Sequence, residues 1–86
     1  MANVLCADGT TYEQTDLSMT ALKKIVGENL KSSPLAEGRL MLSNEDGKLL
    51  GLPFNNQATH LLHESGAEFW ETVMGDVVIC FRDEIA

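Results

Sequence analysis

Residues 44–55 read Asn44-Glu45-Asp46-Gly47-Lys48-Leu49-Leu50-Gly51-Leu52-Pro53-Phe54-Asn55. The first four residues are typical of a polar turn, whose glycine is suited to a positive φ. Residues 48–52 are then expected to form a short strand that pairs with a strand over residues 39–43. Pro53 lacks an amide donor and ends that ladder, and Asn55 or Asn56 is typical of a helix N-cap. This stretch therefore predicts two paired strands followed by a helix.

A helical pattern precedes this stretch. Asp16 or Ser18 is placed to cap a helix whose apolar residues share one face. Those residues are Met19, Leu22, Ile25, Val26 and Leu30. Gly27 is able to end the helix or to lie inside a longer one, and Ser32-Ser33-Pro34 is expected to break it.

Strands are expected at both ends of the chain. The pair Asp8-Gly9 predicts a tight turn between strands over residues 4–7 and 10–14. Residues 76–81 form an apolar run without alternation after the initial aspartate. Both faces of that strand are therefore expected to be covered, in the middle of a sheet.

The second helix is expected to run from its asparagine cap to about Glu64, with Gly66 closing it. Phe54 is placed to pack against the first turns of this helix, and residues 68–74 fit no single pattern. The resulting order of elements is ββαββαβ. We therefore expect an α+β fold in which two helices pack on a single mixed β-sheet, as one domain over residues 1–86.

Length and composition describe a small acidic protein. The 86 residues are 44% hydrophobic, and no apolar run approaches the roughly 20 residues that cross a bilayer. The N-terminal residues lack the features of a secretory signal, so a cytoplasmic location without a membrane partner is expected. A net charge of −7 disfavours direct binding to nucleic acid. The acidity either favours a basic patch on a protein partner or serves solubility alone.

The two cysteines, Cys6 and Cys80, lie at opposite ends of the chain in apolar surroundings. Two isolated cysteines form neither a disulfide framework nor a zinc cluster, so reduced and buried thiols are expected. A bridge between them requires that the first and last strands are neighbours.

The run at residues 44–55 resembles a small family of domains of unknown function found in phages, plasmids and other mobile elements. Members of that family show the pattern N-E-x-G-K-L-x-G-L-P-x-N, followed by an Ala-Thr pair and a G-D-V-V-like strand. Ala58-Thr59 and Gly75-Asp76-Val77-Val78 match these features, and Ile25-Val26-Gly27 is similar to the end of the family's first helix. The resemblance covers roughly residues 20–79. It implies a mobile-element accessory protein and supplies no catalytic residues.

His60, His63 and Glu64 form the cluster most similar to a metal site, since these positions lie near one another on a helix. Both histidines are expected to face away from the apolar side of the helix, and catalytic zinc needs three protein ligands. Surface histidines are therefore expected, with partner contact and metal binding as alternatives. Lys48 does not belong to a phosphate loop, because no Ser or Thr follows it. No nucleophile–base set is recognisable, so we expect no catalytic residue, metal or cofactor and no enzymatic activity.

Phe69 and Trp70 carry a large share of the chain's aromatic surface, between Glu68 and Glu71. One interpretation is core packing, because burial of a large apolar side chain contributes about 1.5–3 kcal/mol. The other is an exposed anchor for a partner, since Trp is enriched at binding hot spots. In that case the two glutamates select a cationic surface.

The leading hypothesis is a non-enzymatic accessory protein of a phage or mobile element that binds a host protein in the host cytoplasm. It fits an inhibitor of a defence system, of the anti-CRISPR or anti-restriction type. The expected partner-binding residues are Phe69, Trp70, Glu68, Glu71, His60, His63 and Glu64. The alternative is a small-molecule binder that sequesters a nucleotide-derived signal, with phosphate contacts from Lys23, Lys24, Arg39 and Lys48. A homodimer is also predicted, because a small sheet leaves edges to cover.

Overall fold

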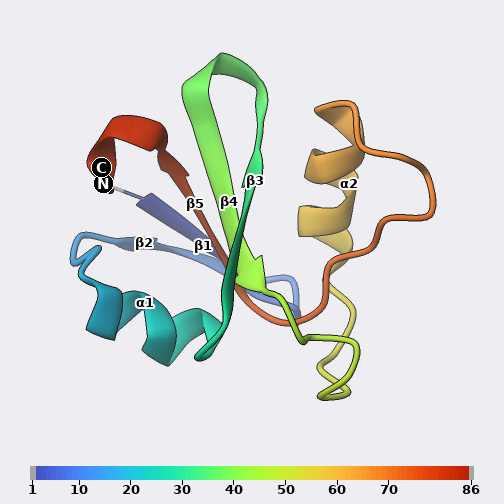
Figure 1. Cartoon of the computed structure of the whole chain (residues 1–86), viewed down its shortest axis with the longest axis horizontal. Helices are drawn as coiled ribbons and strands as arrows, with labels where there is room; N and C mark the ends of the chain where they lie inside the picture. Colours follow the sequence, from blue (N-terminus) through green and yellow to red (C-terminus); the bar gives the residue numbers. More distant parts are fainter. Residues whose placement is uncertain (1, 86) are drawn as a thin grey trace.

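A five-stranded antiparallel sheet with one helix on each face organises the chain (Figure 1). The structure is a computed structural model and describes residues 2–85. The strands lie in the order β2-β1-β5-β4-β3. Their bounds are β1 Ala2–Leu5, β2 Thr11–Gln14, β3 Leu30–Pro34, β4 Arg39–Asn44 and β5 Val77–Phe81. The helices are α1 Met19–Val26 and α2 Asn56–Glu64, with short 3-10 turns η1 Ala36–Gly38 and η2 Arg82–Glu84.

The structure agrees with the predicted α+β fold and with the order ββαββαβ along the chain. The expectation of a mixed sheet is wrong, because every strand pair is antiparallel. The physical reason lies in the connection between β4 and β5, which are sheet neighbours. The chain leaves β4 and enters β5 at the same end of the sheet, so the α2 excursion makes no parallel crossover.

Strand β3 is the main departure from the sequence analysis. The segment Ser32-Ser33-Pro34 was expected to break a helix, but it belongs to this edge strand, which pairs with β4 through the turn η1. β4 therefore lies between β3 and β5 and has no free edge for another strand. The predicted strand over residues 48–52 is consequently wrong. Residues 45–51 form turns instead, held by hydrogen bonds such as Leu50 N to Asp46 O at 2.9 Å.

Helix α1 begins at one of its two candidate caps and ends at Gly27. The Ser18 hydroxyl accepts a hydrogen bond from the Ala21 amide at 3.3 Å, so Ser18 is the N-cap. The helix ends at Gly27, which has a φ of 126° and donates its N–H to Lys23 O. The shorter of the two helices considered from the sequence is therefore present.

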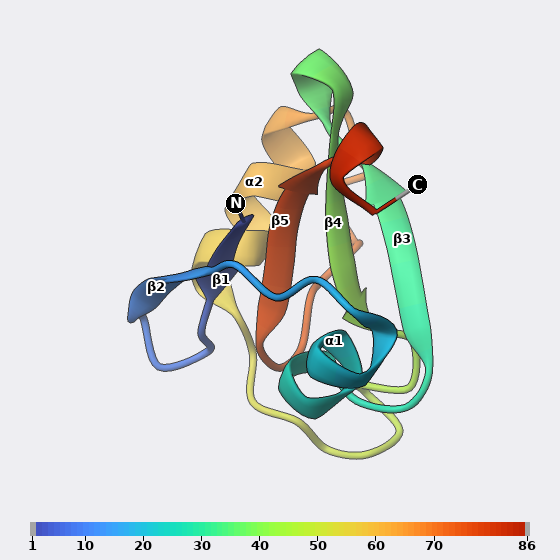
Figure 2. The ribbon, with the colours of Figure 1, turned by 90° about the vertical axis from the view of Figure 1, so that its left-hand side faces the viewer.

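The sheet separates two hydrophobic cores, and the turned view in Figure 2 shows α1 in front of the sheet and α2 behind it. Val78 and Cys80 of β5 face the α1 core, whereas Val77 and Ile79 face the α2 core. The prediction of a central last strand covered on both faces is thus confirmed. The two sheet edges are β2 and β3, and self-association through an edge stays a prediction that light scattering can test.

Both cysteines are free thiols; Cys80 is buried as expected, whereas Cys6 is only half-buried. The first and last strands are neighbours, but their register pairs Asn3 with Ile79 and Leu5 with Val77. Cys6 and Cys80 therefore lie at opposite ends of the β1–β5 pair, too far apart for a bridge. Burial raises the pKa of the Cys80 thiol, which keeps it protonated and unreactive.

Asn55 fixes the start of α2 from a fully buried position. Its Oδ1 accepts a hydrogen bond from the Ala58 amide at 3.0 Å, which is the N-cap interaction. Its Nδ2 donates to Leu5 O and to Gly75 O, both at 2.9 Å. Asn55 and not Asn56 is the cap, and it joins α2 to strand β1 and to the segment before β5.

Candidate functional site

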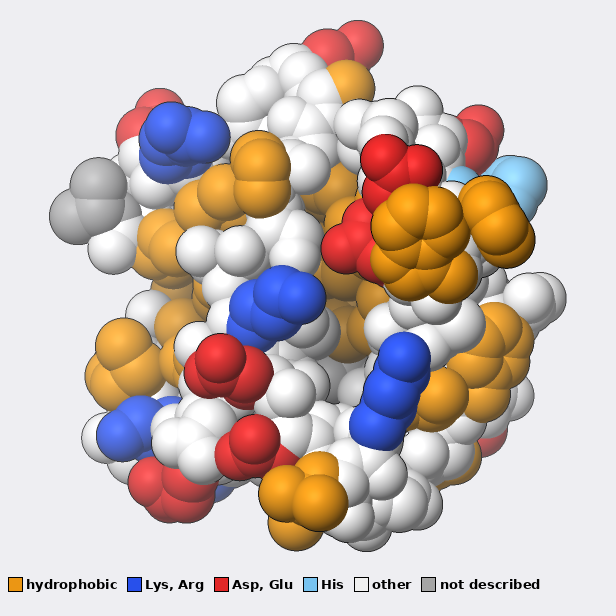
Figure 3. Space-filling view, turned by 45° about the vertical axis from the view of Figure 1, so that its right-hand side comes forward, with side chains coloured by type: hydrophobic (Ala, Val, Ile, Leu, Met, Phe, Trp, Pro, Cys, Tyr) orange, Lys and Arg blue, Asp and Glu red, His pale blue; other side chains and the backbone are white. Residues whose placement is uncertain are grey.

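A groove runs between the β3 edge of the sheet and the segment that follows α2. One hollow of about 250 Å³ lies at its centre, and a second of about 350 Å³ adjoins it toward the end of α2. Both hollows are lined by Lys31, Ser33, Leu62 and Glu71. Figure 3 shows this face of the molecule, with lysine, acidic and hydrophobic side chains around a central depression. We call the lining of both hollows the groove.

One wall of the groove is a segment that we call the aromatic loop, residues 66–74. It presents Phe69 and Trp70 with 82% and 62% of their surfaces exposed. The two rings contact each other edge to face, with centroids 5.2 Å apart and planes at 78°. The interpretation of these rings as core residues is therefore wrong. Trp70 also lines the central hollow, so the aromatic pair and the groove form one continuous surface.

Helix α2 holds the aromatic loop in place through side chains. Nε2 of His63 lies 2.6 Å from Glu71 O, and the Thr59 hydroxyl accepts a hydrogen bond from the Val73 amide at 2.9 Å. Within the loop, Glu68 N donates to Oε2 of Glu71 at 3.0 Å. The exposed rings thus stand on a loop with a defined conformation.

The seven residues predicted to bind a partner divide into three groups. Glu68, Phe69 and Trp70 are exposed on the aromatic loop. His63 and Glu71 are half-buried and support the aromatic loop, so the expectation that His63 faces solvent is wrong. His60 and Glu64 form an exposed pair, with Nε2 and Oε1 3.3 Å apart, on the outer side of α2. Among residues 2–85, no three His, Cys, Asp or Glu side chains are placed to share a metal ion.

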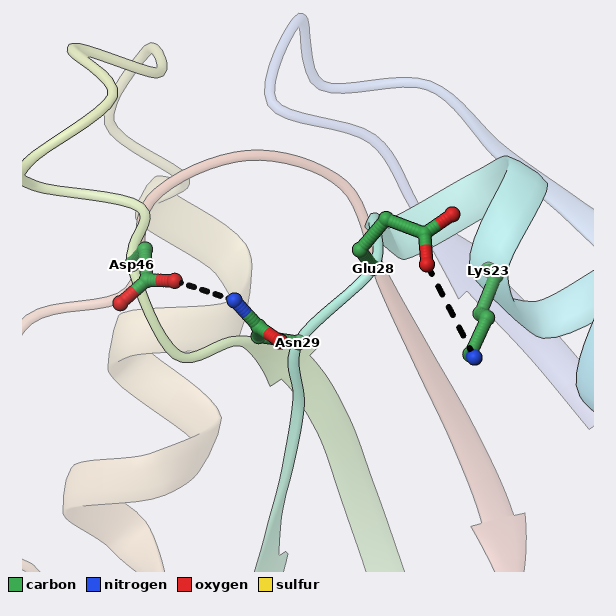
Figure 4. A network of polar contacts seen from close by, with 4 residues as sticks. All are labelled: Lys23, Glu28, Asn29 and Asp46. Carbon is green, nitrogen blue, oxygen red and sulfur yellow. Dashed lines mark hydrogen bonds and ion pairs between the residues drawn. The ribbon is translucent and has the colours of Figure 1, made fainter.

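The opposite end of the groove is formed by residues 44–48, the first part of the 44–55 run. Asn44 donates from Nδ2 to Val26 O at 3.1 Å and accepts at Oδ1 from Asp46 N at 2.8 Å. Figure 4 shows Asn29 reaching across to Asp46, with a hydrogen bond of 2.6 Å. Beyond these anchored residues the chain exposes Leu49 and Leu50 by 86% and 62%.

The lysines are distributed differently from the sequence-based expectation. Lys48 lines the groove together with Lys31, a residue that the sequence analysis did not select. Lys23 pairs instead with Glu28 on the α1 side, 3.8 Å away (Figure 4), and Nε of Arg39 donates to Ala36 O. The sequence analysis did not select Lys31 because the residues that follow it, Ser32-Ser33-Pro34, were expected to break a helix and not to form a strand.

A family described as a domain of unknown function (DUF3846) matches residues 1–85. The chain belongs to this family. No curated protein and no solved structure matches it. Over residues 2–85, neither helix is long and apolar enough to cross a membrane.

Proposed function

We propose that this DUF3846 protein binds another protein through its aromatic loop and catalyses no reaction. The observation that carries the proposal is the exposure of Phe69 and Trp70 on a loop that α2 holds in one conformation. Large aromatics rarely stand so exposed without a role, and Trp is enriched among the residues that dominate binding energy.

The energy of such a contact follows from the area that the rings offer. Covering one large aromatic side chain contributes about 1.5–3 kcal/mol from burial. Because the loop is already ordered by Thr59 and His63, a partner does not have to supply its conformational entropy.

The charge of the surface indicates the kind of partner. Glu68 flanks the ring pair, the His60–Glu64 pair lies on the adjoining helix, and the chain carries a net charge of −7. A basic patch on the partner therefore complements this side of the protein and accelerates association. We expect the affinity to fall as salt is raised, because screening weakens exposed charge pairs.

The biological setting that we propose is that of a phage or other mobile element whose product acts in the host cytoplasm. The support for it is the resemblance of residues 44–55 to proteins of such elements, together with small size and acidity. Inhibition of a host defence protein, of the anti-CRISPR or anti-restriction type, is the function that fits a small acidic protein-binding domain.

The first experiment expresses the tagged protein in its natural host, recovers bound proteins at physiological salt and measures plating of a challenge phage. A specific partner and increased plating are expected. Binding to the purified partner is then measured for Trp70→Ala and for the control Phe81→Ala, a half-exposed aromatic on β5. We expect Trp70→Ala to weaken binding about 30-fold, equivalent to about 2 kcal/mol, with an unchanged Tm. Equal binding by Trp70→Ala and the wild-type protein would refute the role of the loop.

A further inference from the structure

We propose that the groove is a binding site for a nucleoside phosphate, with its phosphate between Lys31 and Lys48 and its base on Trp70. All three side chains line the central hollow. They come from three separate elements: strand β3, the turns after β4, and the aromatic loop.

The phosphate position follows from two lysines that have no acidic partner. The ion pairs among residues 2–85 join Lys23 to Glu28 and His60 to Glu64. Lys31 and Lys48 belong to neither pair, although Glu45 and Glu71 line the same hollow. Lysine ammonium groups are compact point charges that bind phosphate oxygens well. The two free ammonium groups therefore make one anion position.

The base position follows from the exposed ring of Trp70. The edge-to-face contact with Phe69 fixes the indole and leaves it 62% exposed beside the lysines. Stacking of a nucleobase on an aromatic side chain is sequence-tolerant, because every base has a π-face. An aromatic ring next to two cations fits a ligand that is planar at one end and anionic at the other.

Polar groups of the groove complete the fit. Ser33 and Ser43 lie along the sheet side of the hollow and offer hydroxyl donors and acceptors to a sugar and base. The Asn44 side chain is already hydrogen-bonded to Val26 O and Asp46 N and is not assigned to the ligand. Thr72 also lines the hollow, and its buried hydroxyl has no hydrogen-bond partner among residues 2–85. That oxygen is closed off from the open hollow, so we assign it no contact with the ligand.

Local charge makes this site compatible with an acidic protein. The hollow is lined by two lysines and two glutamates, whereas the whole chain has thirteen acidic and six basic residues. Glu71 directs one carboxylate oxygen to the Glu68 amide, so part of its charge is already hydrogen-bonded. The anion thus enters a region far less negative than the surface as a whole.

The phosphate position is separate from the proposed protein contact, because Lys31 and Lys48 lie outside the aromatic loop. It assigns the nucleotide contacts to Lys31 and Lys48 and removes Lys23, Lys24 and Arg39 from that role. Trp70 belongs to both surfaces, so a bound nucleotide and a protein partner compete for one face of the indole.

The chain's sole tryptophan gives a direct test, since Trp70 fluorescence reports on the groove. The full chain is titrated with AMP, GMP, a cyclic mononucleotide and a cyclic dinucleotide, with adenosine, guanosine and inorganic phosphate in separate arms. Lys31→Gln and Lys48→Gln are the test variants, and Lys24→Gln on α1 is the matched control. Calorimetry with the same compounds gives a second readout that does not depend on fluorescence.

We expect a saturable change with at least one nucleotide, at least tenfold weaker binding for Lys31→Gln and for Lys48→Gln, and unchanged binding for Lys24→Gln. All three variants should melt as the wild-type protein does, because the substituted side chains are not buried. The free nucleosides should bind at least tenfold more weakly than their phosphates. The proposal is overturned if no nucleotide binds, if a nucleoside or inorganic phosphate binds as tightly as the nucleotide, or if Lys24→Gln weakens binding as much as the groove variants.

Discussion

Replacement of Asn55 by alanine should be among the most damaging single substitutions in this protein. The variant loses the N-cap of α2, which contributes about 1 kcal/mol, and leaves the Ala58 amide without its partner. It also removes the donor that serves Leu5 O and Gly75 O, and each buried acceptor left unpaired costs about 1–3 kcal/mol. The expected loss is therefore about 3–7 kcal/mol.

That loss is large compared with the stability of a domain of this size. At about 0.05–0.15 kcal/mol per residue, 86 residues give a total of roughly 4–13 kcal/mol. Each kcal/mol corresponds to a change in Tm of about 4–8 °C for so small a domain. The Tm of Asn55→Ala should fall by at least about 12 °C, and the variant is expected to lie near the limit of folding.

Two variants make the test specific. Asn56→Ala changes the neighbouring asparagine, which is exposed, and should alter the free energy of unfolding by no more than about 0.5 kcal/mol. Asn55→Asp retains an acceptor for the helix cap but turns a carboxylate oxygen toward two carbonyl oxygens, so it should destabilise as much as alanine does. Urea unfolding followed by circular dichroism measures all three. An Asn55→Ala protein as stable as Asn56→Ala would refute this account of how α2 is attached to the sheet.

Three further substitutions or conditions test other parts of the structure. Thr59→Val keeps the shape of the side chain but leaves the Val73 amide unpaired, so it should lower the free energy of unfolding by about 1–3 kcal/mol and speed amide exchange in the aromatic loop; unchanged exchange would contradict the proposed anchoring. Gly75→Ala places a methyl group 2.9 Å from Leu52 Cδ1 at a φ of +85°, and should destabilise by more than about 1 kcal/mol in thermal melts; a Tm equal to that of the wild-type protein would argue against this close approach. The Thr10 hydroxyl and amide hydrogen bonds lower the pKa of Asp8 below its ordinary value of 3.8, so its contribution to stability is present above that pH and is lost as pH falls through the lower folded value; Asp8→Asn should flatten that part of the stability–pH curve, and an identical curve would rule the interaction out.

The sequence predicted well those features that depend on neighbouring residues. Each helix is capped by one of its two candidate residues, Ser18 and Asn55, because a cap is a contact between residues three positions apart. The unbroken apolar run from Val77 to Cys80 predicted a strand buried on both faces, and the two cores confirm it.

The errors came from partners that lie far apart in sequence. The turn after Asn44 resembles a hairpin, but whether a strand follows depends on whether β4 has a free edge, and β5 occupies that edge from the other end of the chain. Leu49 and Leu50 therefore lie exposed in turns instead of pairing. For the candidate site, the sequence selected Trp70 but did not include Lys31, which joins it only through the tertiary fold.

The sequence by itself determined that two helices form and roughly where each begins, the central place of the last strand and the family of this protein, since each is written in short runs of adjacent residues. Only the tertiary structure decided which strands pair, that Phe69 and Trp70 stay outside the core, and that two lysines line one hollow together with an indole. The reason is that burial and pairing are decided by competition between distant segments for the same sheet edge and the same core. A local pattern records what a segment is able to form, and the rest of the chain selects among those possibilities.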